Sequence, residues 1–469
     1  MNFRTITLCL AVSLAATTMN AQFQYMPDEN APHEGTWLTW PHHYTYGTAY
    51  RNRLDATWVA MTAALVQSEK VHIIAYNSTE RTRIKNKLIA AGVPLANINF
   101  VLRQSNDVWV RDNGAVFVYS ATNTLKATDW GFNGWGFDTP YTKDNTVPTA
   151  MAAAAGVPLQ NLNNIVLEGG AIEVDQDGVM LATRSAILEP DRNYGLSQAQ
   201  LQNSLVANLG IAKFIWLNGA SGGNDDITDM HIDGFARFGP AGTIVTMSPS
   251  SLAYWQVPAG DITTLYNATD INNAPYDFVQ LPLTANNVVT TYGQNLGYKG
   301  SYVNFYVANT RVLMPSYNDP NDNVAQATLQ GLYPSRTVVK IDCRNLYANG
   351  GMVHCVTQQQ PAAVPMFVPT TNAKSREVFE EAESQSAKLF PSPCDQFMTI
   401  QTTVPTNATC QVEVFDATGK LMLTGGQQQA PEGMFNTTMD LATLPNGVYL
   451  CIVSINGDRG SAQRFVVAH

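Results

Sequence analysis

Amphipathic stretches and short apolar runs alternate along most of this chain. Residues 57–68 (TWVAMTAALVQS) have the apolar spacing of a helix, and residues 71–76 (VHIIAY), which follow, are typical of a buried strand. The same order of a helix and then a strand recurs in residues 81–91 and 98–102, 149–155 and 165–167, 197–209 and 214–217, and 323–332 and 338–341. This alternation predicts an α/β fold.

Corners rich in glycine or aspartate follow these units, and further predicted strands follow the corners. The segments concerned are residues 109–119, 169–183, 230–247, 301–315 and 351–357. They recur at intervals of roughly 50 to 75 residues, within or just above the range of architectural repeats. If the five units close into a ring, their corners converge on one axis. A site built there would draw on distant parts of the sequence.

The two ends of the chain differ from this pattern. Residues 1–21 combine Arg4, a short apolar run and small residues ending at Ala21, which is typical of a secretory signal peptide. Short alternating strands are expected after residue 389, at 397–404, 410–415, 420–424, 447–455 and 464–467, and predict a small β-sandwich. The predicted organisation is a signal peptide (1–21), the α/β domain (22–370), a linker with a short helix near 374–383 (371–388) and the β-sandwich (389–469).

Composition narrows the possible partners. The chain has 469 residues and a net charge of −10, and no basic cluster stands out, so nucleic acid is not an expected partner. No apolar run is long enough to span a bilayer, so no transmembrane segment is expected. With the signal peptide, this predicts an exported protein.

Cysteine usage also bears on chemistry. Of six cysteines, Cys9 lies in the predicted signal peptide, which leaves an odd number and predicts a free thiol. A pair among Cys394, Cys410 and Cys451 could form a disulfide, and the sequence does not say which. Cys355 follows Gly350 and Gly351 in GGMVHCVTQQQP, where a thiol can face a cleft as a nucleophile; a buried, inert cysteine is the alternative. Thiolate chemistry there would call for positive charge nearby.

Three further motifs carry candidate chemistry. WVRDNG places Asp112 near Trp109 at a strand-and-turn corner, and LEGG ends a strand on Glu168 with little steric cover. His231 and Asp233 stand two residues apart, so on a strand both side chains would project from one face. Each motif also has another interpretation. Asp112 could belong to a surface ion pair, and Glu168 could simply end a strand. The His-x-Asp pair could bind a metal, but the sequence offers no third ligand of the expected kind.

Together these residues describe one chemical task. Two carboxylates, Asp112 and Asp233, can hold a planar guanidinium group by accepting from its N–H donors. The central carbon of that group would then face Cys355, and the positive charge of the substrate favours the thiolate. His231 could protonate the departing nitrogen and later activate water, and Glu168 could orient His231.

Six motifs of the predicted α/β domain resemble those of one known family. WVRDNG, DWGFNGWG, LEGGAIEVDQDG, HIDGFARF, SYVNFYVAN and GGMVHCVTQQQP resemble the motifs of the agmatine deiminase and bacterial peptidylarginine deiminase family, from about residue 26 to about 369. The resemblance implies a pentein fold, the five-bladed α/β-propeller, that hydrolyses a guanidine to a urea and ammonia without metal or cofactor. It implies Cys355 as nucleophile, His231 as general acid and base, Asp112 and Asp233 as guanidinium ligands with Glu168 in support, and Trp109, Trp135 and Asn304 as further substrate-binding residues.

The expected substrate is agmatine or a similar small guanidino compound. The peptidylarginine branch carries arginines that hold a terminal carboxylate, whereas residues 132–136 (FNGWG) supply none, and the family's Asn-Arg-Asn-Pro run is here Asp191-Arg192-Asn193-Tyr194. The arginine of a peptide is the alternative substrate, because a signal peptide and an added terminal domain are arranged as in secreted peptidylarginine deiminases.

The tail resembles a type IX secretion sorting domain, in LFPSPCDQFMTIQ, VEVFDATGKLM and LPNGVYLCIVSINGDRGSAQRFVV. That resemblance implies the type IX secretion machinery as a partner and a secreted or outer-surface location, a plain adhesive β-sandwich being the alternative. Two other functional classes explain less of the sequence. A papain-like cysteine hydrolase leaves Asp112 and Asp233 without a role, and a non-catalytic surface-binding module leaves four matching corners unexplained.

Overall fold

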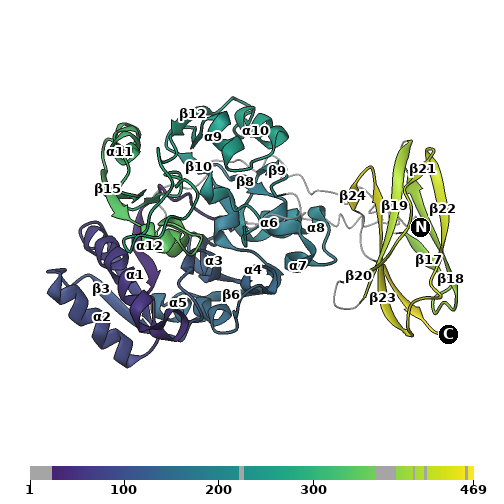
Figure 1. The fold of residues 1–469 in the computed structure, drawn as a ribbon, viewed down its shortest axis with the longest axis horizontal. Helices are drawn as coiled ribbons and strands as arrows, with labels where there is room; N and C mark the ends of the chain where they lie inside the picture. Colours follow the sequence, from purple (N-terminus) through teal and green to yellow (C-terminus); the bar gives the residue numbers. More distant parts are fainter. Residues whose placement is uncertain (1–23, 221–225, 365–386, 405–406, 417–419, 460–462) are drawn as a thin grey trace, which may run out of the picture.

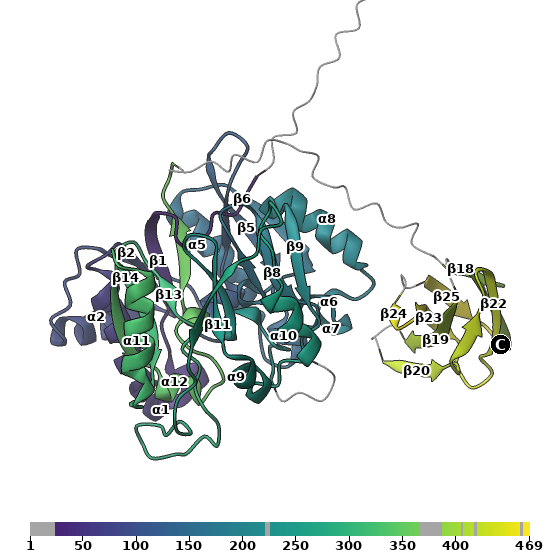
Figure 2. The same ribbon diagram turned by 90° about the horizontal axis from the view of Figure 1, so that it is seen from above.

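The computed structural model describes residues 24–220, 226–364, 387–404, 407–416, 420–459 and 463–469. The predicted signal peptide and the helix expected near 374–383 lie outside these residues. Figures 1 and 2 show the described residues up to 364 as one α/β body and the strands from β17 onward as a second, β-rich body. Each is described by itself.

The α/β body contains five separate sheets. Their strand orders are β16-β1-β2-β3 (Gln358–Pro361, His33–Thr39, Lys70–Ala75, Ile98–Leu102), β4-β5-β6 (Val116–Tyr119, Leu125–Gly131, Leu159–Val166), β7-β8-β9 (Ile172–Val174, Val179–Thr183, Lys213–Leu217), β10-β11-β12 (Ala236–Gly239, Thr243–Met247, Asp277–Leu281) and β13-β14-β15 (Tyr306–Val307, Arg311–Ser316, Thr337–Asp342).

One pairing pattern is common to all five sheets. A central strand pairs antiparallel with one neighbour and parallel with the other, as β5 does with β4 and β6. In the first sheet the antiparallel neighbour of β1 is β16, the last strand of this body, with Trp37 opposite Gln358. The two ends of the repeating region therefore complete one unit together. The closed propeller ring remains a prediction.

Helices make the crossover connections that parallel strands require. They are α1 (His43–Leu65), α2 (Ser78–Ala90), α5 (Val147–Ala155), α8 (Gln198–Leu209), α9 (Pro249–Tyr254), α10 (Ala259–Tyr266) and α11 (Asn321–Leu332). Figure 1 shows α1, α5, α8, α10 and α11 at the outside of the body, with the short α3 (Val110–Asn113) nearer its middle. The other short helices are α4 (Gly134–Phe137), α6 (Ser185–Leu188), α7 (Pro190–Asn193) and α12 (Arg344–Tyr347), with single 3-10 turns η1 (Asp144–Thr146), η2 (Gly169–Ala171), η3 (Ile232–Gly234) and η4 (His354–Val356).

The predicted helices correspond to α1, α2, α5, α8 and α11, and local sequence explains their ends. Ser197 and Gln200 form a reciprocal capping box at the start of α8, and Gly210 ends that helix in the left-handed conformation. The sequence pattern did not predict β1, α9, α10 or β12.

The corner conformations expected from sequence were wrong in three places. His231 and Asp233 do not share a strand face, because residues 232–234 form the 3-10 turn η3. The peptide groups there bond locally and to the next corner: Phe235 N–H donates to Ile232 O, and Asn304 Nδ2 donates to Asp233 O at 3.1 Å. Residues 110–113 and 354–356, also expected as strand or turn, form the short helices α3 and η4.

The β-rich body consists of two sheets. One has the order β17-β18-β22 (Lys388–Phe390, Phe397–Val404, Gly433–Asp440), and the other contains β20-β19-β23-β24 (Leu421–Thr424, Ala408–Asp416, Gly447–Ile455, Asp458–Arg459) with β21 (Gln428–Ala430) and β25 (Gln463–Val467). Met398 and Ile400 from the first sheet and Val414 and Val453 from the second belong to one buried cluster. The two sheets therefore share a core.

The disulfide expected in this body is absent from the described residues. Cys394, Cys410 and Cys451 are free and buried, and so is Cys343, so an unpaired thiol does not by itself single out Cys355. Cys394 Sγ donates to Val466 O at 3.2 Å, and Cys451 packs in the shared core. These thiols fill space as small apolar groups do.

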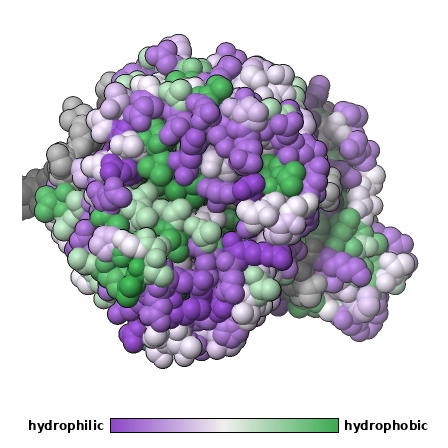
Figure 3. All heavy atoms as spheres, turned by 60° about the vertical axis from the view of Figure 1, so that its left-hand side comes forward, coloured by the Kyte–Doolittle hydropathy of each residue, from purple (hydrophilic) through white to green (hydrophobic). Residues whose placement is uncertain are grey.

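The described helices include none that is both long and apolar enough to cross a bilayer. Figure 3 views the molecule with the left-hand side of Figure 1 brought forward, and hydrophilic residues there are interspersed with smaller apolar areas.

Candidate active site

The predicted site residues meet around Gly170 in η2. A Cβ atom on Gly170 would lie 2.6 Å from His231 Nδ1, 2.8 Å from Asp112 Oδ1 and 3.2 Å from Asp233 Oδ2. Polar side chains from two other corners, α3 and η3, therefore converge on the bare Cα of this residue. Only glycine leaves them room.

Cys355 lies in η4 and is partly exposed. Its Sγ lies 3.5 Å from Asn304 Oδ1 and 3.9 Å from Asp233 Oδ2. Burial, followed by the charges of Asp233 and Asp112, raises the pKa of the thiol well above its usual value. From the sequence, the positive charge that favours the thiolate is expected to come from the substrate, and the protein itself places negative charge next to the sulfur. Its nearest charged partner is a carboxylate, which disfavours the thiolate.

Asp112, at the third position of α3, is buried and held by two donors. The backbone N–H of Gly170 donates to its Oδ1 at 3.0 Å, and Trp135 Nε1 donates to its Oδ2 at 3.1 Å. Burial is the main cause that raises the pKa of Asp112 to about 6, with the nearby Asp233 and Glu168 adding to it and His231 opposing it. A cation bound next to Asp112 would therefore stabilise its ionised form.

Asp233 is held in the opposite way. His354 Nδ1 donates to Asp233 Oδ2 at 2.6 Å. Burial alone would raise the pKa of Asp233, but the hydrogen bond and charge of His354 outweigh burial and lower it below the usual value. Asp233 is therefore kept ionised.

His231 is bound by carboxylates on both ring nitrogens. Its Nε2 lies 2.9 Å from Glu168 Oε2 and its Nδ1 lies 3.6 Å from Asp112 Oδ1. Burial opposes protonation, but Asp112 and Glu168 raise the pKa of His231 to about 9. In the part of the chain that the structure describes, no group of three His, Cys, Asp or Glu side chains is arranged to hold a metal ion.

Glu168 is buried, contrary to the open setting expected before two glycines. Arg192 covers it, with Nε donating to Glu168 Oε1 at 3.0 Å. The same guanidinium binds Asp229 at 2.8 Å and Asp191 at 3.2 Å. Arg192 is thus fully engaged and fixes the carboxylate that holds His231.

The aromatic and amide residues predicted to bind substrate also lie at this site. Trp109 precedes α3, and its ring packs against Gly351, where a Cβ atom would lie 2.2 Å from Cζ3. Trp135 has a left-handed backbone with φ of 55° and bonds Asp112. Asn304 accepts from the backbone N–H of His354 at 2.9 Å and so joins η4 to η3.

Sequence reasoning missed four residues that support this cluster: Glu29, Arg111, Arg192 and His354. His354 stands beside Cys355 and Arg111 beside Asp112, so adjacency to predicted residues was an available signal. Glu29 lies in a polar segment without periodicity, and the sequence offers no comparable signal for it.

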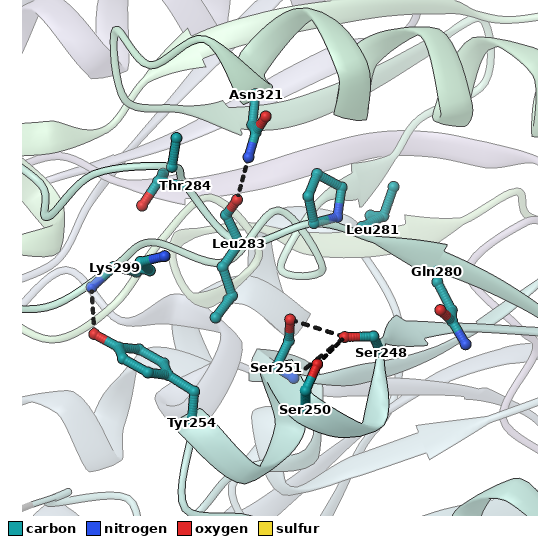
Figure 4. A pocket seen from close by; sticks show the side chains of 12 residues that line it. Ser248, Ser250, Ser251, Tyr254, Gln280, Leu281, Leu283, Thr284, Lys299 and Asn321 are labelled. Carbon is teal, nitrogen blue, oxygen red and sulfur yellow. Dashed lines mark hydrogen bonds between the residues drawn. The ribbon is translucent and has the colours of Figure 1, made fainter.

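A surface cavity of about 620 Å³ lies apart from this cluster and is lined by none of the predicted site residues. Figure 4 shows it among Ser248, Ser250 and Ser251 of the α9 start, Tyr254, Lys299 and Asn321. Its lining hydroxyls mostly bond one another, as Ser248 Oγ does with Ser251 Oγ at 3.0 Å.

Most of this chain is similar to known proteins. Residues 25–361 match the model of the Porphyromonas-type peptidyl-arginine deiminase family, and residues 388–468 match that of a secretion system C-terminal sorting domain. An agmatine deiminase of Pseudomonas fluorescens (strain SBW25) is 32% identical over 369 residues, covering 74% of this chain and 98% of that protein. One from Pseudomonas syringae pv. tomato is 31% identical, covering 74% and 98%.

Solved structures are also similar to this chain. The agmatine deiminase of Enterococcus faecalis has a TM-score of 0.63 with 26% identity and covers 73% of this chain and 96% of that chain. A structure from Porphyromonas gingivalis has a TM-score of 0.63 with 32% identity, covering 73% and 99%. The chain belongs to the Porphyromonas-type peptidyl-arginine deiminase family, hydrolases that act on C–N bonds, and carries a type IX secretion sorting domain at its C-terminus.

Proposed function

We propose that this protein hydrolyses agmatine, or a similar small guanidino compound, to the carbamoyl product and ammonia through a covalent bond to Cys355. One observation carries the proposal: the thiol lies beside ionisable carboxylates, and its pKa is raised by burial and by Asp233 and Asp112. A cationic substrate bound between the carboxylates would place positive charge next to the sulfur, where the nearest charged group of the protein is Asp233. The nucleophile is then formed when the substrate binds.

The guanidinium group lies between Asp112 and Asp233 in this proposal. Their carboxylates accept from its N–H donors in the plane of the group. Trp109 and Trp135 flank it, and Asn304 keeps the corner of Cys355 against the corner of Asp233. The pKa of about 6 for Asp112 means that the carboxylate is ionised at neutral pH and gains a counter-ion on binding.

The thiol gives its proton to solvent water as the cation binds, and Sγ bonds to the guanidinium carbon. Protonated His231 gives its proton to a terminal nitrogen, the C–N bond breaks, and ammonia leaves a thiouronium on Cys355. Neutral His231 takes a proton from water, whose oxygen bonds to the same carbon. The C–S bond breaks, and the proton of the added hydroxyl passes to the sulfur, which releases the neutral urea product and restores the thiol.

The five sheets are arranged, in this proposal, as the blades of a five-bladed α/β-propeller. Two observations support it: each sheet has the same antiparallel and parallel pairing, and β16 completes the sheet of β1. The corners α3, η2, η3 and η4 also contribute to one cluster, as converging blade ends would.

A small substrate is favoured over a peptide because the arginines that the structure describes next to predicted site residues, Arg111 and Arg192, are paired with carboxylates of the protein itself. Arg192, the arginine of the Asp191-Arg192-Asn193-Tyr194 run, is buried and bonded to Glu168 and Asp229. The curated relatives described above are agmatine deiminases. Peptidyl-arginine is the second candidate, because the matching family model is that of a peptidyl-arginine deiminase and the chain carries a sorting domain.

Ammonia release by the purified mature protein, residues 22–469, tests both candidates. We expect turnover of agmatine to exceed that of a peptide ending in arginine, and Cys355→Ala to abolish it. Cys343→Ala, which removes another buried free thiol, is the matched control and should keep activity. A preference for the peptide would overturn the substrate, and activity in Cys355→Ala would overturn the mechanism. Activity lost on adding a chelator would refute the metal-free expectation.

The sorting domain indicates secretion or an outer-surface location. In the proposal, residues 1–21 direct export and residues 389–469 engage the type IX secretion machinery. A chain ending at residue 370 should remain inside the outer membrane, whereas the full chain should reach the cell surface or the medium. Equal distribution of the two would contradict the role of the tail.

A further inference from the structure

Glu29, in the segment before β1, is the acceptor for four donors from four different elements. Its Oε1 accepts from Val307 N–H at 2.7 Å and lies 3.0 Å from Arg237 Nη2. Its Oε2 accepts from Arg111 Nη2 at 3.1 Å and from His354 Nε2 at 2.9 Å. The Glu29 side chain is 8% exposed, so each oxygen is satisfied inside the protein.

Each donor stands close in sequence to a residue of the proposed site. Arg111 precedes Asp112 in α3, and His354 precedes Cys355 in η4. Arg237, in β10, follows the turn that carries Asp233, and Val307, in β13, follows Asn304. One carboxylate therefore binds the corners that carry four of the predicted site residues.

His354 connects Glu29 to the site itself. Its Nε2 lies 2.9 Å from Glu29 Oε2 and its Nδ1 lies 2.6 Å from Asp233 Oδ2. Ionised carboxylates only accept hydrogen bonds, so both ring nitrogens must donate. The ring thus carries two protons and a positive charge between two carboxylates. The Asp233 oxygen that lies 3.9 Å from Cys355 Sγ is the same oxygen that contacts this cation.

We propose that Glu29 is a positioning residue of the deiminase reaction: it fixes the four corners against one another and, by holding His354 doubly protonated, keeps Asp233 ionised for the substrate cation. The inference rests on the proposed function, because it assigns Asp233 the role of guanidinium ligand. Glu29 itself touches neither Cys355 nor the substrate position.

The electrostatics of the described residues support this geometry. Burial would raise the pKa of Glu29, but Arg237, His354 and Arg111 hold it well below its usual value. The pKa of Asp233 is likewise lowered against burial, by His354 first and then by His231 and Arg237. The other titratable groups near the two carboxylates are Asp28, Tyr306, Tyr333, Asp112 and Cys355.

Removing the charge of Glu29 should therefore act on Asp233 from a distance. Without that carboxylate, His354 loses one of the two acceptors that hold its protons, and a neutral ring no longer offsets the burial of Asp233. An opposite charge at this range shifts a carboxyl pKa by about 1 to 3 units, so the pKa of Asp233 should rise by about one unit or more.

The alternative is that Glu29 only stabilises the fold, as a buried ion pair can. The pH profile of kcat/KM separates the two, since loss of packing lowers the rate without moving the profile. We compare Glu29→Gln, which removes the charge, with Glu29→Asp, which keeps it. Glu34→Gln is the matched control, because it removes a carboxylate from another histidine pair, His72 Nε2 to Glu34 Oε2 at 2.7 Å, away from the site.

With agmatine as substrate and full-length mature protein, Asp112 sets the acid limb of the wild type near pH 6. In Glu29→Gln the pKa of Asp233 rises toward that value, so we expect the acid limb to become steeper, because two carboxylates then take up protons. We also expect kcat/KM at neutral pH to fall at least about tenfold, because the four corners lose their common acceptor. Glu29→Asp should keep the wild-type steepness, and Glu34→Gln should leave the whole profile unchanged. An acid limb of unchanged steepness in a folded, active Glu29→Gln protein would overturn the inference. Inactive wild-type protein would instead overturn the proposed function.

A measurement on the wild-type protein covers the case in which Glu29→Gln does not fold. Nitrogen-15 NMR of histidine rings reports whether both nitrogens carry protons. In addition to His231, we expect one other buried histidine to show two protonated ring nitrogens at neutral pH, with both N–H protons slow to exchange. If His354 is a neutral tautomer, Glu29 does not hold its charge and the inference fails.

Discussion

The Sγ atom of Cys355 lies 3.9 Å from Oδ2 of Asp233, the same oxygen that accepts from His354 at 2.6 Å. A carboxylate that is fixed in its ionised form thus stands beside a thiol whose pKa is raised by burial and by that charge. The pair is unfavourable for a thiolate in the free protein and favourable for a bound cation. The relationship suits a nucleophile that becomes reactive only in the presence of its substrate.

The rate at which Cys355 is alkylated should show how strongly the charge of Asp233 suppresses its thiolate form. Asp233→Asn removes the nearest negative charge, lowers the pKa of the thiol and should speed its reaction with iodoacetamide at pH 8 by about tenfold or more, since one pKa unit is a tenfold change in thiolate. Peptide mass mapping identifies the modified residue. Cys343 is fully buried and serves as the internal control, because its labelling should not change. A slower reaction in the variant would contradict the assigned cause.

Gly170→Ala should disable the site while leaving the fold intact. The added Cβ would lie 2.6 Å from His231 Nδ1 and 2.8 Å from Asp112 Oδ1, so these groups must move, and a displacement of about 1 Å costs on the order of a hundredfold in rate. The matched control is Gly260→Ala in α10, where a Cβ meets nothing within 4 Å. That change should keep activity and stabilise the helix slightly. Unchanged kcat/KM in Gly170→Ala would show that the cluster is not the site.

The residues proposed to do the chemistry could be singled out from sequence because each stands in a short motif with a distinctive composition. Asp112, Glu168, His231, Asp233 and Cys355 do lie together. Their local conformation could not be predicted. The two-residue spacing of His231 and Asp233 fits a strand, but it also fits the 3-10 turn that the structure shows, which a hydrogen bond from Asn304 supports.

The supporting residues were hidden for a different reason. Glu29 owes its place to donors that come from residues 111 to 354, and such long-range pairing leaves no periodic pattern in the sequence. The same holds for the pairing of β16 with β1, which joins the two ends of the α/β body. The cysteines of the β-rich body misled because a thiol that packs as an apolar group and one that forms a disulfide look alike in sequence.

Trp135→Phe should weaken substrate binding more than it slows chemistry. The change removes the indole N–H that donates to Asp112 Oδ2 at 3.1 Å, so Asp112 becomes harder to ionise and a bond to a charged group is lost. Such a bond is worth about 1.5 to 3 kcal/mol, and we expect KM for agmatine to rise about tenfold or more. Trp216→Phe is the control, because the buried Trp216 Nε1 has no acceptor and its loss should leave KM unchanged. A fall in kcat alone would contradict this role.

The pH dependence of kcat/KM should show two limbs set by Asp112 and His231. The pKa of Asp112 is raised to about 6, so activity should fall below that pH as the guanidinium ligand is protonated. The pKa of His231 is raised to about 9, so the proton needed by the leaving nitrogen is lost above that pH. The raised pKa of His231 also makes the free energy of unfolding depend on pH. His231 is protonated more readily in the folded than in the unfolded state, so its contribution to the free energy of unfolding is fully present below its unfolded pKa of 6.5 and is lost as pH rises through about 9.

Glu168→Gln tests these assignments together. Glu168 raises the pKa of both His231 and Asp112, so its removal should move both limbs to lower pH, whereas Glu29→Gln should make the acid limb steeper without moving the alkaline limb. The free energy of unfolding, measured with urea, should also begin to fall at a lower pH in Glu168→Gln than in the wild type, because His231 then loses its proton earlier. Arg192 complicates the comparison, since the variant leaves its guanidinium with only Asp229 and Asp191 among its carboxylate partners. Glu168→Gln/Arg192→Gln, which removes both charges, should show the same two shifts in kcat/KM. An alkaline limb that stays near pH 9 in both proteins would mean that the titrating acid is not His231.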